Sequence, residues 1–287
     1  MALRQGALRW HTCEEKGCII RQRLERDGKH GGRVELVYLA LVLLLAGTGC
    51  SSIADLAAGA ARYHLLTITA AEHGAGNRGQ HEGGSATQSE TTEPNPSKDT
   101  VYQLSVANTT IAYPVVKQRP EDPDGFYLSH DAWRRPCGAG SLYLDRDSGK
   151  DCAHQIVYGH RLIMTNMMFS PLSNAWEPKG FESLGAMTLR DTKTGSSRTL
   201  KPLCALKVHE SFASIRRFEF NGKAEFASWL NKLCSYADVV SKGSETRLNH
   251  VERALTTVTC TGRLGGDMRC LVIWIEEDAA AATTENR

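Results

Sequence analysis

The chain has 287 residues, a length that suits one large domain or two ordinary ones. Its 34 lysine and arginine residues nearly balance its 32 aspartate and glutamate residues, and the net charge of +2 argues against a protein that mainly grips nucleic-acid phosphates. Hydrophobic residues make up 41% of the chain, too many for wholesale disorder and too few for a membrane transporter. None of the nine cysteines forms a CxxC pair, which excludes the usual zinc-ribbon and thioredoxin motifs.

The first hydrophobic element is residues 36–54, which run for 19 positions without a charged side chain. A helix needs about 20 such residues to cross the hydrocarbon core of a bilayer. Residues 1–35 carry eight lysines and arginines, and the positive-inside rule therefore keeps them in the cytoplasm. We expect a basic cytoplasmic segment and a transmembrane signal anchor. A cleaved signal peptide and a lipoprotein attached through Cys50 are the alternatives, although Gly47 stands where a lipoprotein signal normally has an aliphatic residue.

Residues 55–100 predict a short helix followed by a flexible polar linker. Within them, residues 71–100 contain five glycines and no valine, isoleucine, leucine, methionine or aromatic residue, so they cannot bury enough surface to fold. A coil of this length spans about 30 Å, enough to hold the following domain clear of a bilayer. The last residues, 279–287, predict a disordered tail.

Residues 101–278 have a different sequence pattern, in which short β-rich runs such as QIVYG, ALTTVTC and CLVIWIE alternate with turn residues. This spacing is typical of a closed barrel or a β-sandwich. One segment instead has large apolar residues at helical spacing, namely Phe226, Trp229, Leu230 and Leu233. We therefore expect a mostly β domain with one helix at 222–236.

Three residues in this domain carry possible chemistry. His160 ends the apolar strand QIVYGH, Cys260 ends ALTTVTC, and Arg269 is the only charge in the run MRCLVIWI. Alone, each has an ordinary interpretation: a surface histidine, an inert or disulfide-bonded thiol, and a structural ion pair. Together they can supply a thiolate nucleophile, a proton donor for a leaving amine and an oxyanion partner, which is an acyl-transfer site. The histidine precedes the cysteine by 100 residues, which excludes papain-like proteases.

These residues resemble the sortases, which join bacterial surface proteins to the cell wall or to one another. IVYGH followed by MMFSPL is similar to the class B histidine motif, TTVTC is similar to the TLxTC cysteine signature, and MRCLVIW places an arginine nine residues after the cysteine. The segments IAYPVV, FYLSHDAW and GSLYLD, together with the expected helix at 222–236, extend the resemblance over about residues 101–277.

The resemblance implies a closed eight-stranded sortase β-barrel with a helical insertion before the cysteine strand. It also implies that His160, Cys260 and Arg269 are the catalytic triad of a class B cysteine transpeptidase that needs no metal or cofactor. Cys260 would form a thioacyl intermediate with a C-terminal sorting motif, and an amine would resolve it. Thr259 and Ser235 are candidate substrate contacts, with packing and capping as their simpler roles.

The implied partners are surface proteins or pilins with a C-terminal sorting motif, and an acceptor amine from a peptidoglycan precursor or a pilin lysine. The implied location is the bacterial cell membrane, crossed once, with the N-terminus in the cytoplasm and the catalytic domain outside. Two alternatives stay open: a sortase that polymerises pilins, and a surface module that binds sorting signals without catalysis.

The sequence departs from the family pattern at two kinds of position. Thr257 stands where the cysteine signature usually has leucine, and we expect it to alter the packing under the nucleophile more than the chemistry. The domain also holds five cysteines besides Cys260. Cys137 and Cys152 flank a short strand and are candidates for a disulfide outside the cell. The other three, Cys204, Cys234 and Cys270, have no assignment from the sequence.

Overall fold

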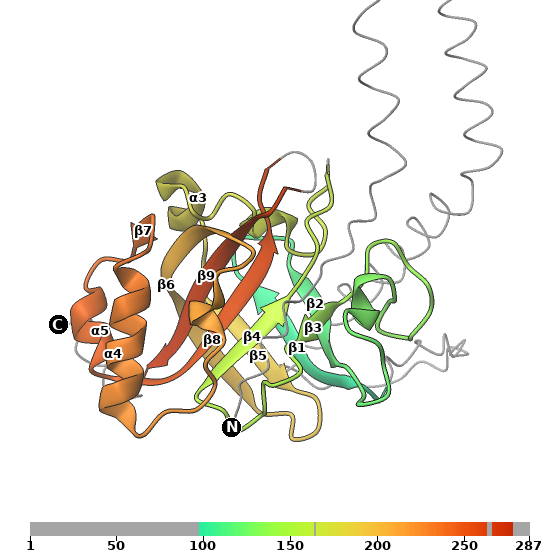
Figure 1. Cartoon of the computed structure of the whole chain (residues 1–287), viewed down its shortest axis with the longest axis horizontal. Coiled ribbons are helices and arrows are strands. Elements are labelled where there is room, and N and C mark those ends of the chain that lie inside the picture. The colour runs from blue at the N-terminus through green and yellow to red at the C-terminus, as the bar shows by residue number, and fades with distance from the viewer. Residues whose placement is uncertain (1–97, 164, 263–265, 278–287) are drawn as a thin grey trace, which may run out of the picture.

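The computed structural model describes residues 98–163, 165–262 and 266–277 (Figure 1). Within those ranges no helix is long and apolar enough to cross a membrane. The expected signal anchor at 36–54, the linker up to residue 97 and the tail beyond residue 277 lie outside the described residues. The first strand begins at Thr100, one residue before the expected start of the domain.

The described strands form one sheet in the order β5-β1-β2-β3-β4-β8-β9-β6-β7. Strand β5 also pairs with β6, which closes eight strands into a barrel and leaves β7 as an extension beside β6. The closed eight-stranded barrel expected from the sequence is confirmed. The strands are β1 (Thr100–Val106), β2 (Ala112–Lys117), β3 (Leu142–Leu144), β4 (His154–Tyr158), β5 (Met187–Asp191), β6 (Ser197–His209), β7 (Val239–Val240), β8 (Val251–Cys260) and β9 (Met268–Glu277).

The helices lie in the connections between strands. Helix α4 (Lys223–Cys234) confirms the predicted helix at 222–236 and lies between β6 and β8 in the chain. Its apolar stripe is buried, as the helical spacing of the large residues predicted. The other helical elements are short: α3 (Pro178–Glu182), α5 (Ser244–Leu248) and the 3-10 turns η1 (Phe126–Leu128), η2 (Ser170–Leu172) and η3 (Ala213–Ile215).

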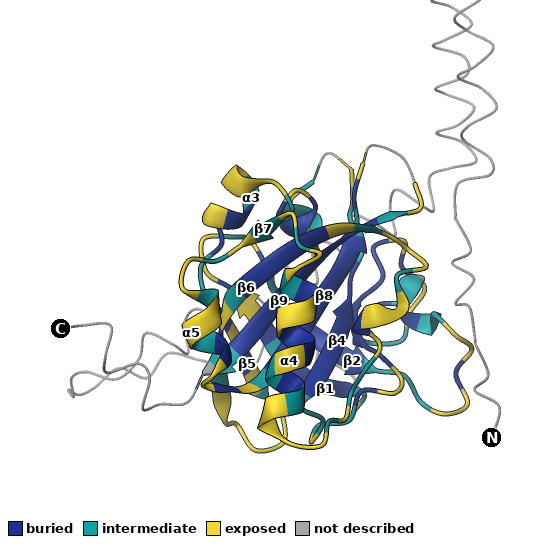
Figure 2. Ribbon diagram, turned by 60° about the vertical axis from the view of Figure 1, so that its left-hand side comes forward, coloured by how far each residue is buried: buried dark blue, intermediate teal, exposed yellow. Residues whose placement is uncertain are grey.

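The two faces of the sheet have different roles. The ring of Trp229 in α4 packs on the ring of His154 in β4, with centroids 4.7 Å apart. The face that carries His154 is therefore the outer face, and α4 covers part of it (Figure 2). The opposite face lines the barrel, where the indole N–H of Trp274 donates to the Thr257 hydroxyl at 3.1 Å. Thr257 thus gives a fully buried tryptophan the acceptor that a leucine would lack.

His154 is completely buried beneath α4. Its Nδ1–H donates to the Arg217 carbonyl at 2.8 Å, which leaves Nε2 to accept from the Thr256 hydroxyl, also at 2.8 Å. Burial lowers the pKa of His154 to about 4, although the bond to the Arg217 carbonyl acts in the opposite direction. The imidazole is therefore neutral at pH 7, where it ties β4, β8 and the segment after η3 together.

Acid should destabilise the protein through His154. The folded-state pKa of about 4 lies below the ordinary value of 6.5, so the unfolded chain takes up a proton first as the pH falls. The His154 contribution is present above about pH 6.5 and is lost between about pH 6.5 and 4, with about 2 to 3 kcal/mol gone by pH 4.5. Urea denaturation at pH 7.5 and pH 4.5 measures it. His154→Gln should lose less free energy of unfolding over the same interval, and an equal loss would contradict the assignment.

The described cysteines are all free thiols. Cys137 and Cys152 are not joined, so the disulfide considered from the sequence is absent from the structure. The Cys152 sulfur instead accepts a bond from the Gly149 N–H at 3.2 Å. A different pair is adjacent: the thiols of Cys204 on β6 and Cys234 at the end of α4 are hydrogen bonded to each other.

Oxidised glutathione should convert Cys204 and Cys234 into a disulfide and release two molecules of reduced glutathione. Cys234 lines a pocket between α4 and α5, and its pKa is lowered by the hydrogen bond from Cys204 and by Arg247. Cys234 therefore attacks the oxidant, and the buried Cys204 then displaces glutathione. The bridge closes a loop of about 30 residues, worth about 3 to 4 kcal/mol in the chain-entropy model.

Peptide mapping and melting with and without reductant measure this bridge. Cys204→Ser should abolish both the cross-link and the reductant-sensitive rise in Tm. A bridge mapped to Cys137 and Cys152, or no bridge at all, would contradict the expected pairing.

Candidate active site

The three predicted catalytic residues meet at one rim of the barrel, at the ends of β4, β8 and β9. Cys260 is the last residue of β8, and it pairs across the ladder with Arg269 of β9. In the parallel pair β4–β8, Tyr158 stands opposite Val258, and the N–H of Gly159, the residue after β4, donates to the Val258 carbonyl at 3.1 Å. His160 follows Tyr158 by the same two residues by which Cys260 follows Val258. The alternation of side chains therefore puts all three on the outer face.

Cys260 is partly exposed, whereas Cys204 and Cys270 are buried. The chain leaves β8 directly afterwards at Gly262, whose φ of 91° suits a residue without a side chain. Among the described thiols, Cys260 alone pairs across the sheet with an arginine.

The ring of His160 is oriented by one backbone oxygen. Its Nε2 lies 2.8 Å from the Leu128 carbonyl oxygen. A carbonyl oxygen only accepts, so the neutral ring carries its proton on Nε2 and keeps a lone pair on Nδ1. Burial lowers the pKa of His160, and the Leu128 bond opposes that shift. The resting histidine is therefore neutral at pH 7 and able to accept a proton at Nδ1.

Arg269 is held at the rim by three oxygen atoms. Its Nη2 lies 2.6 Å from the Glu210 carboxylate, and its Nη1 donates to the carbonyls of Gly266 at 2.7 Å and Met268 at 3.1 Å. Only 7% of the residue is exposed. Glu210 follows β6 directly, where its own N–H donates to the Asp267 carbonyl. The guanidinium thus takes part in a structural ion pair, on the residue that is the ladder partner of Cys260.

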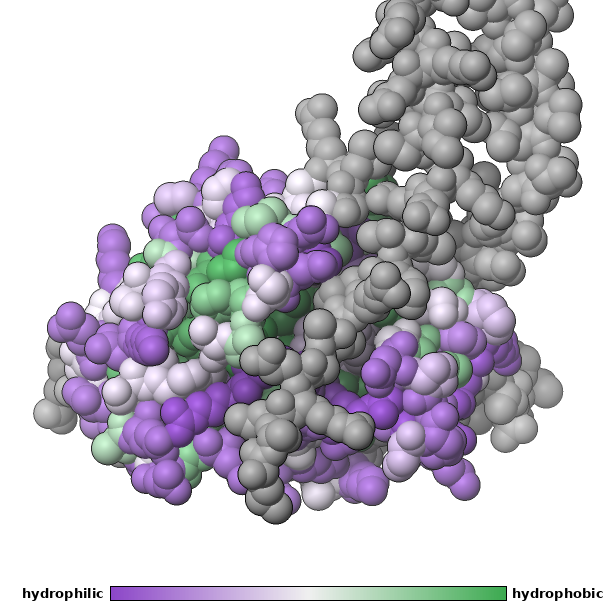
Figure 3. All heavy atoms as spheres, viewed as in Figure 1, coloured by the Kyte–Doolittle hydropathy of each residue, from purple (hydrophilic) through white to green (hydrophobic). Residues whose placement is uncertain are grey.

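Tyrosines and a buried carboxylate pack next to this rim. The Tyr158 hydroxyl donates to Asp145 at 2.7 Å, and Arg216 from the segment after η3 pairs with the same carboxylate at 3.0 Å. Tyr143 stacks on Tyr158, and burial raises the pKa of its phenol, with Asp145 and Cys260 acting in the same direction. Figure 3 shows hydrophobic side chains gathered over the central strands, with hydrophilic ones around them.

Several solved structures with this architecture are sortase B structures. Clostridium perfringens sortase B is 25% identical, with a TM-score of 0.54 over 63% of this chain and 94% of that chain. A Staphylococcus aureus sortase B–substrate complex is 21% identical, with a TM-score of 0.53 over 63% of this chain and 82% of that chain. A Bacillus anthracis protein described as similar to sortase B is 20% identical, with a TM-score of 0.51 over 62% and 78%.

The chain has a sortase fold. The comparison with protein-family models finds no match, and neither does the comparison with curated proteins.

The sortase fold separates the two predicted substrate contacts from the triad in different ways. Thr259 is buried and pairs with Cys270, and as the neighbour of Cys260 it points to the opposite face of the sheet, into the barrel. Ser235 caps α4, where its hydroxyl donates to the Lys232 carbonyl at 2.7 Å, and it lines the pocket between α4 and α5. Packing and capping, the simpler roles considered from the sequence, describe both residues.

The sequence interpretation missed the groups that hold the triad in place. Glu210 lies 59 residues before Arg269, and the Leu128 carbonyl lies 32 residues before His160. No motif marks either residue, because one acts through a tertiary ion pair and the other through its backbone. Among residues 98–163, 165–262 and 266–277, no group of histidine, cysteine, aspartate and glutamate side chains is arranged to hold a metal ion. Catalysis without a metal stays a prediction.

Proposed function

We propose that this protein is a cysteine transpeptidase of the sortase type, anchored in a bacterial membrane. The observation that carries the proposal is the ladder pair of Cys260 with Arg269, with His160 at the end of the adjoining strand. Nucleophile, acid–base group and oxyanion donor then share the outer face of three neighbouring strands. Sortase B structures with the same fold support this assignment.

The reaction starts when the Cys260 thiol passes its proton to Nδ1 of His160. The thiolate attacks a carbonyl carbon of the sorting motif, and Arg269 stabilises the oxyanion of the tetrahedral intermediate. The C–N bond breaks, His160 returns the proton to the leaving amine, and a thioester stays on Cys260. An acceptor amine then attacks the thioester and gives a proton to His160, the C–S bond breaks as the new amide forms, and His160 returns that proton to the Cys260 sulfur, which restores the resting thiol.

Class B specificity is part of the proposal. The helix-containing segment between β6 and β8 supports it, as do solved sortase B neighbours that include a substrate complex. The donor is a surface protein with a C-terminal sorting motif, and the acceptor is a cell-wall amine. We also propose that residues 36–54 anchor the protein, with residues 1–35 in the cytoplasm and the barrel outside, because the uncharged run is long enough to span and its flank is basic.

The test uses the full-length protein in detergent with a library of sorting-motif peptides. Mass spectrometry should find a thioester adduct on Cys260 that hydroxylamine releases as a hydroxamate. Adding peptidoglycan-type amines or a pilin lysine peptide then identifies the acceptor from the mass of the product. Absence of any adduct across a broad library, or an adduct confined to another cysteine, would overturn the proposal and favour a module that only binds sorting signals.

A further inference from the structure

The orientation of His160 depends on a single backbone oxygen in the loop between β2 and β3. That oxygen belongs to Leu128, the last residue of the turn η1, and it fixes the proton of the neutral ring on Nε2. If the turn shifted, the imidazole would be free to rotate or exchange tautomers, and Nδ1 would no longer be fixed as the proton acceptor of the ring.

The loop approaches His160 so closely that one position excludes a side chain. Gly140 has a φ of 61°, and a Cβ there would lie 2.6 Å from the Tyr127 carbonyl oxygen, 2.9 Å from the Leu128 carbonyl oxygen and 3.0 Å from the His160 ring. The Ser141 N–H, next in the chain, donates to the Tyr127 carbonyl at 2.9 Å. The end of the loop is therefore packed directly against the turn that holds the histidine.

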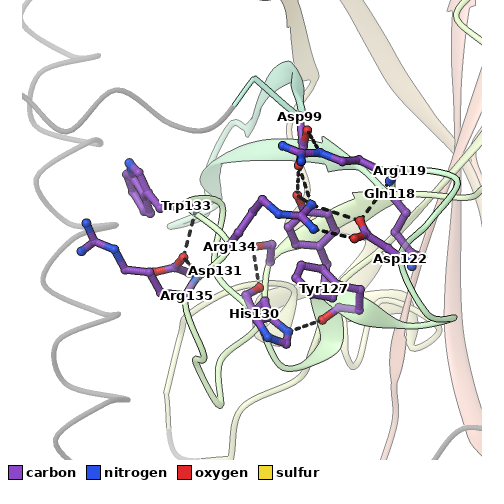
Figure 4. A network of polar contacts seen from close by, with 12 residues as sticks. Asp99, Gln118, Arg119, Asp122, Tyr127, His130, Asp131, Trp133, Arg134 and Arg135 are labelled. Atoms are coloured by element: carbon purple, nitrogen blue, oxygen red, sulfur yellow. Dashed lines mark hydrogen bonds and ion pairs between the residues drawn. The ribbon is translucent and has the colours of Figure 1, made fainter.

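Arg134 contacts the start of η1 and forms ion pairs with Asp99 and Asp122, which Figure 4 shows. Its Nη1 lies 2.7 Å from Asp99, its Nη2 lies 2.5 Å from Asp122, and the guanidinium lies 4.4 Å from the centroid of the Phe126 ring. The Tyr127 hydroxyl donates to the same Asp99 carboxylate at 2.7 Å. Both residues that precede Leu128 in the turn are thus in contact with this cluster.

The backbone of Arg134 is itself unusual. Its φ is 66°, a left-handed conformation that costs free energy for a residue with a side chain. Its N–H donates to the Asp131 carbonyl at 2.9 Å, which closes the tight turn. This backbone shape carries the guanidinium to both carboxylates at once, across 35 residues to Asp99 and 12 residues to Asp122.

We propose that Arg134, with Asp99 and Asp122, positions His160 by fixing the turn that carries the Leu128 carbonyl. These are positioning residues, because none of them touches His160 or Cys260 in the contacts described above. The proposal rests on the proposed function for the role of His160, although the orientation of the ring is measurable without any substrate.

The first experiment measures the tautomer of His160 in the resting full-length protein by ¹⁵N NMR of labelled histidine, assigned with His160→Gln. The wild type should show the proton on Nε2. Arg134→Met should give a mixture of tautomers, and Arg134→Lys, which keeps the charge but loses the two-pronged guanidinium, should fall between them. In turnover with a sorting-motif peptide, kcat should fall roughly 10- to 100-fold in Arg134→Met, with little change in KM, because the general acid–base group is misplaced.

Arg198→Met is the matched control. Arg198 pairs with Glu276, and its side chain is 22% exposed, against 25% for Arg134. This variant also removes a half-buried, ion-paired arginine, and it should keep the wild-type tautomer and kcat. If Arg134→Met does not fold, the nearly isosteric Asp122→Asn replaces it and tests whether weakening the Arg134–Asp122 ion pair shifts the His160 tautomer.

A wild-type tautomer in folded Arg134→Met or Asp122→Asn overturns the positioning role. A shifted tautomer supports it even if no peptide is turned over by the wild type, and that second result would count against the proposed transpeptidase alone.

Discussion

Cys260→Ala should abolish transpeptidation while the protein stays folded and still binds the sorting-motif peptide. The side chain ends β8 at a partly exposed position, so its truncation removes the nucleophile and leaves only a small cavity. No thioester adduct should form with any peptide, whereas a peptide labelled with a fluorophore should bind with nearly unchanged affinity. Circular dichroism and Tm check the fold.

Cys152→Ala is the control for loss of a thiol. Cys152 is also partly exposed, lies outside the rim formed by β4, β8 and β9, and should keep full activity. His160→Ala should form the adduct far more slowly, because the leaving amine then lacks its proton donor. An active Cys260→Ala protein would remove the basis for the mechanism.

Arg269→Lys should reduce kcat/KM by roughly 10² to 10³, similar to the loss of one oxyanion donor. A lysine ammonium keeps the charge, but its single nitrogen cannot bond to Glu210 and to two backbone carbonyls and still offer a donor to the oxyanion. Steady-state kinetics with a sorting-motif peptide measures the loss, and the Tm separates it from unfolding.

Glu210→Gln distinguishes chemistry from structure at this position. The amide keeps the shape of the carboxylate and a hydrogen bond to Arg269, so activity should fall less than about 10-fold. If Glu210→Gln and Arg269→Lys lost the same activity and the same stability, Arg269 would act only as the partner of Glu210.

The sequence alone was enough to predict the candidate catalytic residues at the rim and the order of the strands and the main helix. Short apolar runs ending in His160 and Cys260, with Arg269 inside a fully apolar strand, predicted strand ends with acyl-transfer chemistry, and the resemblance to sortases implied the closed barrel. The spacing of Phe226, Trp229 and their neighbours predicted α4, because a helical stripe repeats locally along the chain. Local patterns of this kind are readable from sequence since they depend on residues a few positions apart.

Only the tertiary structure decided how these side chains are supported and which way they face. Thr259 seemed close to the chemistry because it adjoins Cys260, yet adjacent residues of a strand point to opposite faces, and it packs inside the barrel. The cysteine pairing was left open by the sequence, and the structure leaves the candidates Cys137 and Cys152 as free thiols.

The groups that hold the site in place come from distant parts of the chain. The Leu128 carbonyl, Glu210 and the ion pairs of Arg134 act across 12 to 59 residues. Backbone oxygens and ion pairs of this kind leave no periodicity and no motif in the sequence. They become visible only when strand register sets which segments meet, because the strength of an ion pair or a hydrogen bond depends on distance and burial rather than on position along the chain.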